Sequence, residues 1–130
     1  MAYVYYNLNP DKKDTIDCTI RAVSLILGQS WERTFIHIMI ECLVHHDMPE
    51  ANYIWAGYLK SRGFVRKLIP DTCPDCYTIR DFCADHPIGR YILGTGYHAV
   101  AVIDGDYYDV FDSGDYVPIY FWCASEVSSL

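Results

Sequence analysis

Long apolar runs are missing from this sequence of 130 residues. No stretch reaches the roughly 18 consecutive apolar residues that a membrane-spanning helix needs. The first residues, Met1 to Asn7, lack the basic region and apolar core of a secretory signal, so we expect a cytoplasmic protein with no membrane partner. A reducing compartment predicts that the six cysteines are thiols rather than a disulfide framework.

Basic residues are also scarce. Ten Lys and Arg residues stand against seventeen Asp and Glu residues, which leaves a formal net charge of -7. Such a charge repels phosphate backbones unless cations gather on one face, and here they are scattered along the chain, so no nucleic-acid partner is expected. Repeats, linkers and low-complexity segments are lacking too, which predicts a single domain over residues 1–130.

Apolar residues make up 52% of the chain and charged residues 21%, proportions typical of a globular protein. The first 17 residues form an extended, polar segment, and helical periodicity follows it. Gly28 ends the first helix, Ser30 caps the second, and His45-His46-Asp47 ends the second. The pattern predicts helices over 18–27, 31–45, 49–62 and 79–85, with a strand over 64–69.

The last third of the chain changes to the alternation of strands. Strands are predicted over 91–93, 97–103, 107–111 and 117–122, with a hairpin turn at Asp104-Gly105-Asp106. Helices first and a strand meander second define an α+β fold, in which N-terminal helices pack on a C-terminal antiparallel β-sheet.

Cys18 opens the most apolar of the predicted helices, within Asp17-Cys18-Thr19-Ile20-Arg21-Ala22. Unpaired N–H groups and the positive end of the helix dipole favour a thiolate at this position, so the thiol pKa falls below its free value of about 8.5. Taken alone, Cys18 is equally well explained as a small apolar residue of the core.

A histidine and two aspartates follow on the predicted hairpin. His98 comes after the Gly94-Thr95-Gly96 joint, and imidazole is well suited to accept a proton from a thiol near neutral pH. A three-residue turn at 104–106 sets His98 opposite Asp112, with Cβ atoms about 5 Å apart. The same register sets the rival Asp109 opposite Ala101. We therefore predict that Cys18 is the nucleophile, His98 its base and Asp112 the group that orients His98.

At these residues the chain resembles the papain-like superfamily of cysteine peptidases. It is most similar to small bacterial and bacteriophage members and to the C39-type and transglutaminase-like relatives. The motifs are Asp17 to Ala22, Gly96-Tyr97-His98 and Asp104 to Asp112, and the similarity spans roughly Asn7 to Trp122. The resemblance implies a papain-like hydrolase that cleaves a peptide, isopeptide or related amide bond in a peptide or protein substrate, with no cofactor.

The superfamily supplies a side-chain amide, often Gln, shortly before the nucleophile to bind the oxyanion. This sequence has no Gln there. Asn9 is the nearest side-chain amide and Asn7 the next, so both are candidates to act beside the backbone N–H of Cys18. Arg21 lies one turn beyond Cys18, where it either pairs with a buried acid, which we favour, or holds a substrate carboxylate.

Other interpretations stay open. Cys73, Cys76, Cys83 and His86 have the residue types of a tetrahedral zinc site, although their spacing is compressed, and we favour a chain without metal. An NlpC/P60-type or CHAP-type peptidoglycan amidase or endopeptidase would use the same Cys–His chemistry. An acyltransferase would share the thioester step, and a non-catalytic binding module on this fold would need neither residue. The sequence does not indicate an oligomeric state.

Overall fold

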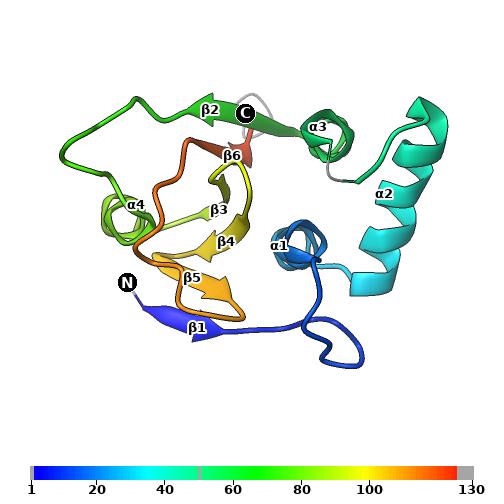
Figure 1. Ribbon diagram of the computed structural model, residues 1–130, viewed down its shortest axis with the longest axis horizontal. Coiled ribbons are helices and arrows are strands. Elements are labelled where there is room, and N and C mark those ends of the chain that lie inside the picture. Colours follow the sequence, from blue (N-terminus) through cyan, green and yellow to red (C-terminus); the bar gives the residue numbers. More distant parts are fainter. Residues whose placement is uncertain (1, 50, 126–130) are drawn as a thin grey trace.

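The computed structural model describes residues 2–49 and 51–125, and within them the chain forms four helices and one mixed sheet of six strands. The strand order across the sheet is β1-β5-β4-β3-β6-β2 (Figure 1). The helices are α1 (Cys18–Leu27), α2 (Trp31–His45), α3 (Asn52–Ser61) and α4 (Ile79–Asp85); the strands are β1 (Tyr3–Tyr5), β2 (Phe64–Leu68), β3 (Arg90–Gly94), β4 (Ala99–Ile103), β5 (Asp106–Asp109) and β6 (Tyr120–Ala124).

Three helices cover one face of the sheet and the fourth covers the other (Figure 1). Helix α1 packs directly on β4 and β3, α3 packs on β2, and α2 lies outside them against α1 and α3. Helix α4 packs against β5 from the opposite face. None of the described helices has the length and apolar character required to cross a membrane.

Side-chain size differs between the two faces of β4. Ala99 and Ala101 belong to the core under α1, whereas Val100 and Val102 belong to the core under α4. Successive residues of a strand point to opposite faces, so this alternation puts the smaller side chains toward α1. The backbone of α1 can therefore approach β4 closely, and this brings Cys18, at the start of α1, near the start of β4.

The predicted mixture of helices and strands is confirmed, and so are several element boundaries. The Ser30 hydroxyl accepts a hydrogen bond from the backbone N–H of Arg33, and Gly28 ends α1 in the left-handed conformation. The third helix begins at Asn52 rather than at position 49. The predicted antiparallel sheet is wrong at one edge, because β1 pairs with β5 in parallel.

The β4–β5 hairpin has a different register from the predicted one. Asp104 and Gly105 have φ angles of 49° and 82° and form a two-residue turn, with Ile103 paired with Asp106. Positive φ at both central residues is the type I′ geometry, which matches the twist of a hairpin. The prediction counted Asp106 in the turn and was therefore wrong by one residue, which moves side chains to the other face.

Gly94 gives a test of packing between β3 and β6. It lies opposite Tyr120, and a Cβ added at Gly94 would lie 2.2 Å from Cζ of that buried ring. We expect Gly94→Ala to lower the free energy of unfolding by about 1–3 kcal/mol, because the ring must leave its site. Denaturant unfolding measures this change.

The matched control is Gly57→Ala on the exposed side of α3. An added Cβ at Gly57 has no heavy atom within 4 Å, so this variant should gain about 0.5–1 kcal/mol from the higher helix propensity of Ala. Equal effects of the two substitutions would contradict the packing of Tyr120 over Gly94.

Candidate active site

Cys18 is the first residue of α1 and is half-buried. Asp17 stands at the N-cap position, but its carboxylate makes no capping hydrogen bond. Instead it accepts from Nη1 of Arg21 and from Nε1 of Trp31, each at 2.9 Å. The first amides of α1 are therefore left without a side-chain cap beside the thiol, at the positive end of the helix.

His98 ends a tight turn immediately before β4. Thr95 donates its backbone N–H to the carbonyl of His98 at 2.9 Å, and its hydroxyl accepts from the backbone N–H of His98 at 3.1 Å. Gly96 takes a φ of 99° inside this turn, a conformation that L side chains rarely adopt. The turn thus holds the backbone of His98 from both sides, and this limits where the imidazole can point.

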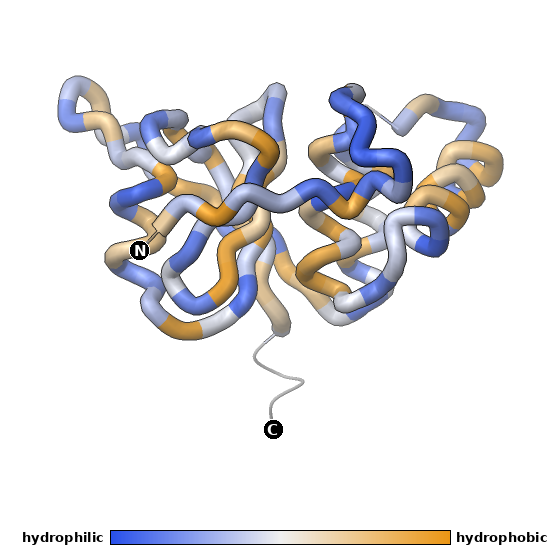
Figure 2. Tube along the Cα trace, turned by 90° about the horizontal axis from the view of Figure 1, so that it is seen from below, coloured by the Kyte–Doolittle hydropathy of each residue, from blue (hydrophilic) through white to orange (hydrophobic). Residues whose placement is uncertain are grey.

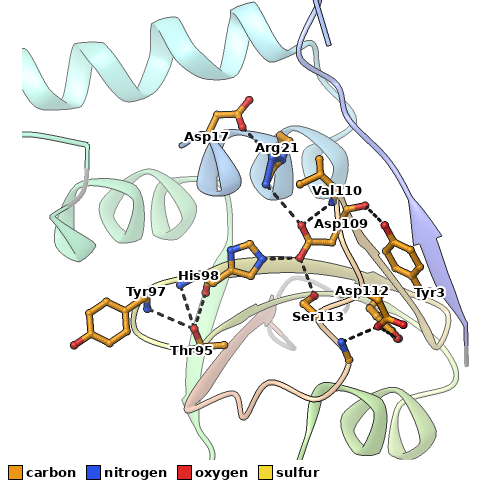
Figure 3. A network of polar contacts seen from close by, with 12 residues as sticks. Tyr3, Asp17, Arg21, Thr95, Tyr97, His98, Asp109, Val110, Asp112 and Ser113 are labelled. Atoms are coloured by element: carbon orange, nitrogen blue, oxygen red, sulfur yellow. Dashed lines mark hydrogen bonds and ion pairs between the residues drawn. The ribbon is translucent and has the colours of Figure 1, made fainter. Parts of the chain in front are cut away.

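The imidazole of His98 points at Asp109, the last residue of β5 (Figure 3). Nε2 of His98 lies 2.6 Å from Oδ2 of Asp109, whose side chain is 2% exposed. Ser113 donates its hydroxyl to the same Oδ2 at 2.7 Å, and the backbone N–H of Val110 donates to Oδ1 at 2.8 Å. The carboxylate is held on both oxygens, so the histidine ring is oriented by a rigid acceptor.

Asp112 is not the partner of His98, so the predicted pairing is wrong. Its carboxylate accepts from the guanidinium of Arg80 at 3.0 and 3.1 Å and from the hydroxyl of Tyr107 at 2.5 Å. Its side chain is 46% exposed. The cause is the hairpin register. When the observed pairing is continued by one residue, Asp109 becomes the diagonal neighbour of His98 on the same face of the hairpin. A carboxylate at a diagonal position is within reach of an imidazole.

Arg21 joins the helix to this carboxylate. Its side chain is buried, with Nη1 at 2.9 Å from Asp17 and Nη2 at 3.7 Å from Asp109 (Figure 3). Arg21 is thus paired with two buried acids, as the favoured interpretation of the sequence expected. Removing either partner would leave an uncompensated charge in the interior.

Cys18 and His98 form an electrostatically coupled pair. Burial raises the pKa of the Cys18 thiol, but hydrogen bonds from the His98 ring and the Ala99 backbone, with the charges of His98 and Arg21, lower it by more, so the pKa lies below its ordinary value. Burial lowers the pKa of His98, but hydrogen bonds to Asp109 and Cys18 and their charges raise it to about 9. Both shifts favour the thiolate–imidazolium form of the pair over the neutral form.

Asn9 and Asn7, the two candidate oxyanion donors, are both buried but differ in their free hydrogen-bonding groups. Asn7 uses both ends of its amide, accepting from the N–H of Asn9 and donating Nδ2 to the carbonyl of Lys13. Asn9 accepts at Oδ1 from the N–H groups of Asp11 and Lys13, while its Nδ2 bonds to none of the described residues. Asn9 also lines the cleft that contains Cys18. Its amide is therefore the one with an N–H to offer to a ligand.

A cleft of about 670 Å³ opens over Cys18 and His98. One wall comes from α2, where Trp31 and Phe35 stack with ring centroids 5.1 Å apart. Trp55 and Tyr120 lie deeper, and the turn with Tyr97 forms part of the rim. The size is that of a small-ligand or peptide side-chain pocket, and apolar rings supply much of the lining.

Two aromatic rings that the sequence analysis missed lie against His98. Phe111 and Tyr116 have ring centroids 5.1 and 5.9 Å from the imidazole, and both belong to the loop after β5. They cover part of the His98 side chain, which is 13% exposed. Ser113, from the same loop, was missed as well. No local motif marks these three residues, because only the path of the loop brings them to the histidine.

The alternative zinc ligands do not form a site. Cys73 and Cys76 are exposed in a loop, whereas Cys83 is buried in the core under α4. The Nδ1 atom of His86 lies 2.8 Å from the carbonyl of Phe82. Among residues 2–49 and 51–125, no group of three or more His, Cys, Asp or Glu side chains is arranged to hold a metal ion.

The site in this mixed α+β fold combines a thiol, an imidazole and a carboxylate. They belong to half-buried Cys18, to His98 at the end of the sheet and to buried Asp109. No protein-family model, no curated protein and no solved structure matches this chain.

The two aspartates can be distinguished by titrating His98. We expect Asp109→Asn to lower the pKa of His98 from about 9, because the variant removes both the hydrogen bond and the negative charge that raise it. Asp112→Asn should leave the pKa unchanged, since Asp112 bonds to Arg80 and Tyr107 instead. NMR titration of the imidazole resonances, assigned with His98→Gln, measures both. A larger shift in Asp112→Asn would contradict the observed pairing.

Proposed function

We propose that this protein is a papain-like cysteine hydrolase that cleaves an amide bond in a peptide or protein substrate, with Cys18, His98 and Asp109 as its catalytic triad. The observation that carries the proposal is that Cys18 and His98 line the same cleft while Nε2 of His98 is bonded to the buried Asp109 carboxylate, and the His98 ring lowers the pKa of the Cys18 thiol. Nucleophile, base and orienting group stand in the order that thiol catalysis requires.

Acylation begins from the thiolate–imidazolium pair. The Cys18 sulfur attacks the carbonyl carbon of the substrate, and the negative charge moves to the carbonyl oxygen. The backbone N–H of Cys18 and Nδ2 of Asn9 are the donors proposed to stabilise that oxyanion. His98 then gives its proton to the leaving amine as the C–N bond breaks, which leaves an acyl group on Cys18 and a neutral imidazole.

Deacylation reverses the proton transfer. Neutral His98 takes a proton from water, the resulting hydroxide attacks the thioester, and the Cys18 thiolate leaves as the carboxylic acid product forms. Asp109 keeps the ring in one orientation through both steps and stabilises the imidazolium each time it forms. Because Nε2 of His98 is bonded to Asp109, Nδ1 is the nitrogen that exchanges protons with the thiol and the substrate.

The lining of the cleft favours a peptide over a cell-wall glycopeptide. Trp31, Phe35 and Met39 present rings and aliphatic groups that match an apolar side chain. The sugars of peptidoglycan would call for a mainly polar lining, whereas apolar groups make up most of the exposed lining here, although Lys13 and Asn52 also line the cleft. We therefore place the NlpC/P60-type and CHAP-type activities second.

Alkylation tests activation of the nucleophile without knowledge of the substrate. At pH 6 we expect limiting iodoacetamide to label half-buried Cys18 before exposed Cys73, because only the thiolate reacts. A hydrogen bond to Asp71 and the charge of that carboxylate raise the pKa of Cys73, whereas the pKa of Cys18 is lowered. Mass mapping of the labelled peptides gives the order of reaction.

Accessibility alone predicts the opposite order, so the two explanations are separable. His98→Ala is the control, and it should abolish the preference for Cys18 by removing the group that stabilises the thiolate. Labelling of Cys73 and Cys76 ahead of Cys18 in the unmodified protein would remove the basis for an activated thiol.

Turnover is tested with a proteome-derived peptide library. We expect the unmodified protein to create new N-termini that Cys18→Ala does not, with a loss of at least roughly 1,000-fold in rate because the triad acts as a unit. Mass spectrometry of the products reports both cleavage and its sequence preference. If the two proteins bind the same peptides equally and neither cleaves them, the fold serves as a binding module.

The two asparagines provide a further test on any cleaved peptide. Asn9→Ala should lower kcat by about 100- to 1,000-fold with little change in KM, as expected for loss of a donor that acts mainly in the transition state. Asn7→Ala should act mainly on stability, because its amide is engaged within the loop. Steady-state kinetics and thermal unfolding of both variants separate the two roles, and an unchanged kcat in Asn9→Ala would rule out Asn9 as the donor.

A further inference from the structure

Helix α2 carries apolar side chains on two faces. Thr34, Ile38 and Cys42 are buried on the face toward α1 and α3. The opposite face carries four large aliphatic residues, each more than half exposed: Ile36 (55%), Ile40 (51%), Leu43 (72%) and Val44 (65%). Spacings of four, three and one residue put these four on one side of the helix, which we call the outer stripe.

The outer stripe lies at the edge of the molecule. Helix α2 is the outermost element of its layer (Figure 1), and the apolar colouring of this helix is visible at the edge of the tube in Figure 2. A surface helix ordinarily directs polar residues outward, and a helix that is apolar all round is buried on all sides. The outer stripe therefore has the composition of a covered surface.

The stripe also has the symmetry that pairing with itself requires. Ile40 is central, with Ile36 four residues before it and Val44 four residues after it. Two α2 helices packed antiparallel about a two-fold axis at Ile40 would place Ile40 against Ile40 and Ile36 against Val44 of the other copy. An interface between identical copies of this kind has to match itself in this way.

Charge at the two ends of the stripe is complementary in the same arrangement. Arg33 lies near the start of α2, and Asp47 lies just past its end, after His46 in the left-handed conformation, so antiparallel packing would bring Arg33 of one copy close to Asp47 of the other. The guanidinium of Arg33 makes no hydrogen bond or ion pair with any residue of 2–49 or 51–125. The Asp47 carboxylate accepts from the Met48 N–H and the Tyr53 hydroxyl, which holds it at the end of the helix. In the sequence, Glu32 is next to Arg33 and His46 is next to Asp47.

We propose that the protein forms a symmetric dimer through the outer stripe of α2, with a second copy of this chain as the occupant. Burial of the four aliphatic residues from each copy drives the association, and the two Arg33–Asp47 pairs set its antiparallel direction. The proposal does not depend on the chemistry of Cys18, so Cys18→Ala should dimerise like the unmodified protein.

Sedimentation of the full chain over about 1–200 µM tests the proposal, because association makes the mass depend on concentration. We expect a rise from 15.0 kDa toward twice that mass. Ile40→Glu puts two carboxylates on the axis and should raise the dissociation constant roughly 100-fold or more. The matched control is Ile88→Glu. Ile88 is an aliphatic residue outside α2 and is 79% exposed, so this substitution should leave the dissociation constant unchanged.

A charge exchange tests the direction of packing. Arg33→Asp and Asp47→Arg should each weaken the dimer, and the double variant should restore affinity, because the pair is re-formed with reversed signs. Thermal unfolding of every variant verifies that the monomer stays folded. A monomer over the whole concentration range, or a dimer that Ile40→Glu does not weaken, overturns the proposal. Single and double charge variants of equal affinity would overturn the antiparallel arrangement.

Discussion

The site depends on the ion pairs of the buried Arg21 guanidinium. It lies one turn after Cys18 and pairs with Asp17 on its own helix and with Asp109 at the end of β5. A buried charge that loses a partner costs several kcal/mol, so these groups are forced to stay together. The pairing therefore sets the rotation of α1 relative to the sheet, and with it the direction in which the Cys18 sulfur points.

The same network determines protonation. Two carboxylates and one guanidinium leave one negative charge in a buried region, and the imidazolium of His98 balances it. This explains in physical terms why the pKa of His98 rises to about 9 although burial alone would lower it. An ionised ring beside Cys18 then lowers the pKa of the thiol. The position of the proposed nucleophile thus depends on Arg21, whereas its ionisation depends mainly on His98, whose pKa is raised by Asp109 and by Cys18 itself.

Local signals in the sequence predicted the helices of the N-terminal half well. Where the prediction failed, the failure also has a physical reason. Ser30 and Gly28 act through their own backbone neighbourhood, so the helix boundaries near them could be read directly. Cys18 and His98 were proposed because each was predicted at the end of an element, and the structure places both in the lining of one cleft. The choice between Asp109 and Asp112 depended on one residue of hairpin register. The Asp104-Gly105 dipeptide does carry the type I′ signal, so a two-residue turn would have pointed to Asp109.

Other features had no local signal. The parallel pairing of β1 with β5 joins residues separated by most of the chain, and nothing in the Tyr-rich segment specifies its direction. The contacts of Phe111, Ser113 and Tyr116 with the His98–Asp109 pair depend on how the loop after β5 folds back. Sequence patterns report element type and ends, whereas these contacts are products of tertiary packing.

The hydrogen bonds of Asp17 show how neighbouring elements keep the first amides of α1 free of a side-chain cap. An aspartate at an N-cap ordinarily accepts from the first amides of its helix, which here would place a carboxylate beside the sulfur and oppose its ionisation. Arg21 and the indole of Trp31 bind both carboxylate oxygens and draw Asp17 away from the cap. The start of α2, set by Ser30, thereby helps to leave the amide of Cys18 open. An aspartate next to the proposed nucleophile is compatible with a thiolate because Arg21 and Trp31 hold its carboxylate away from the sulfur.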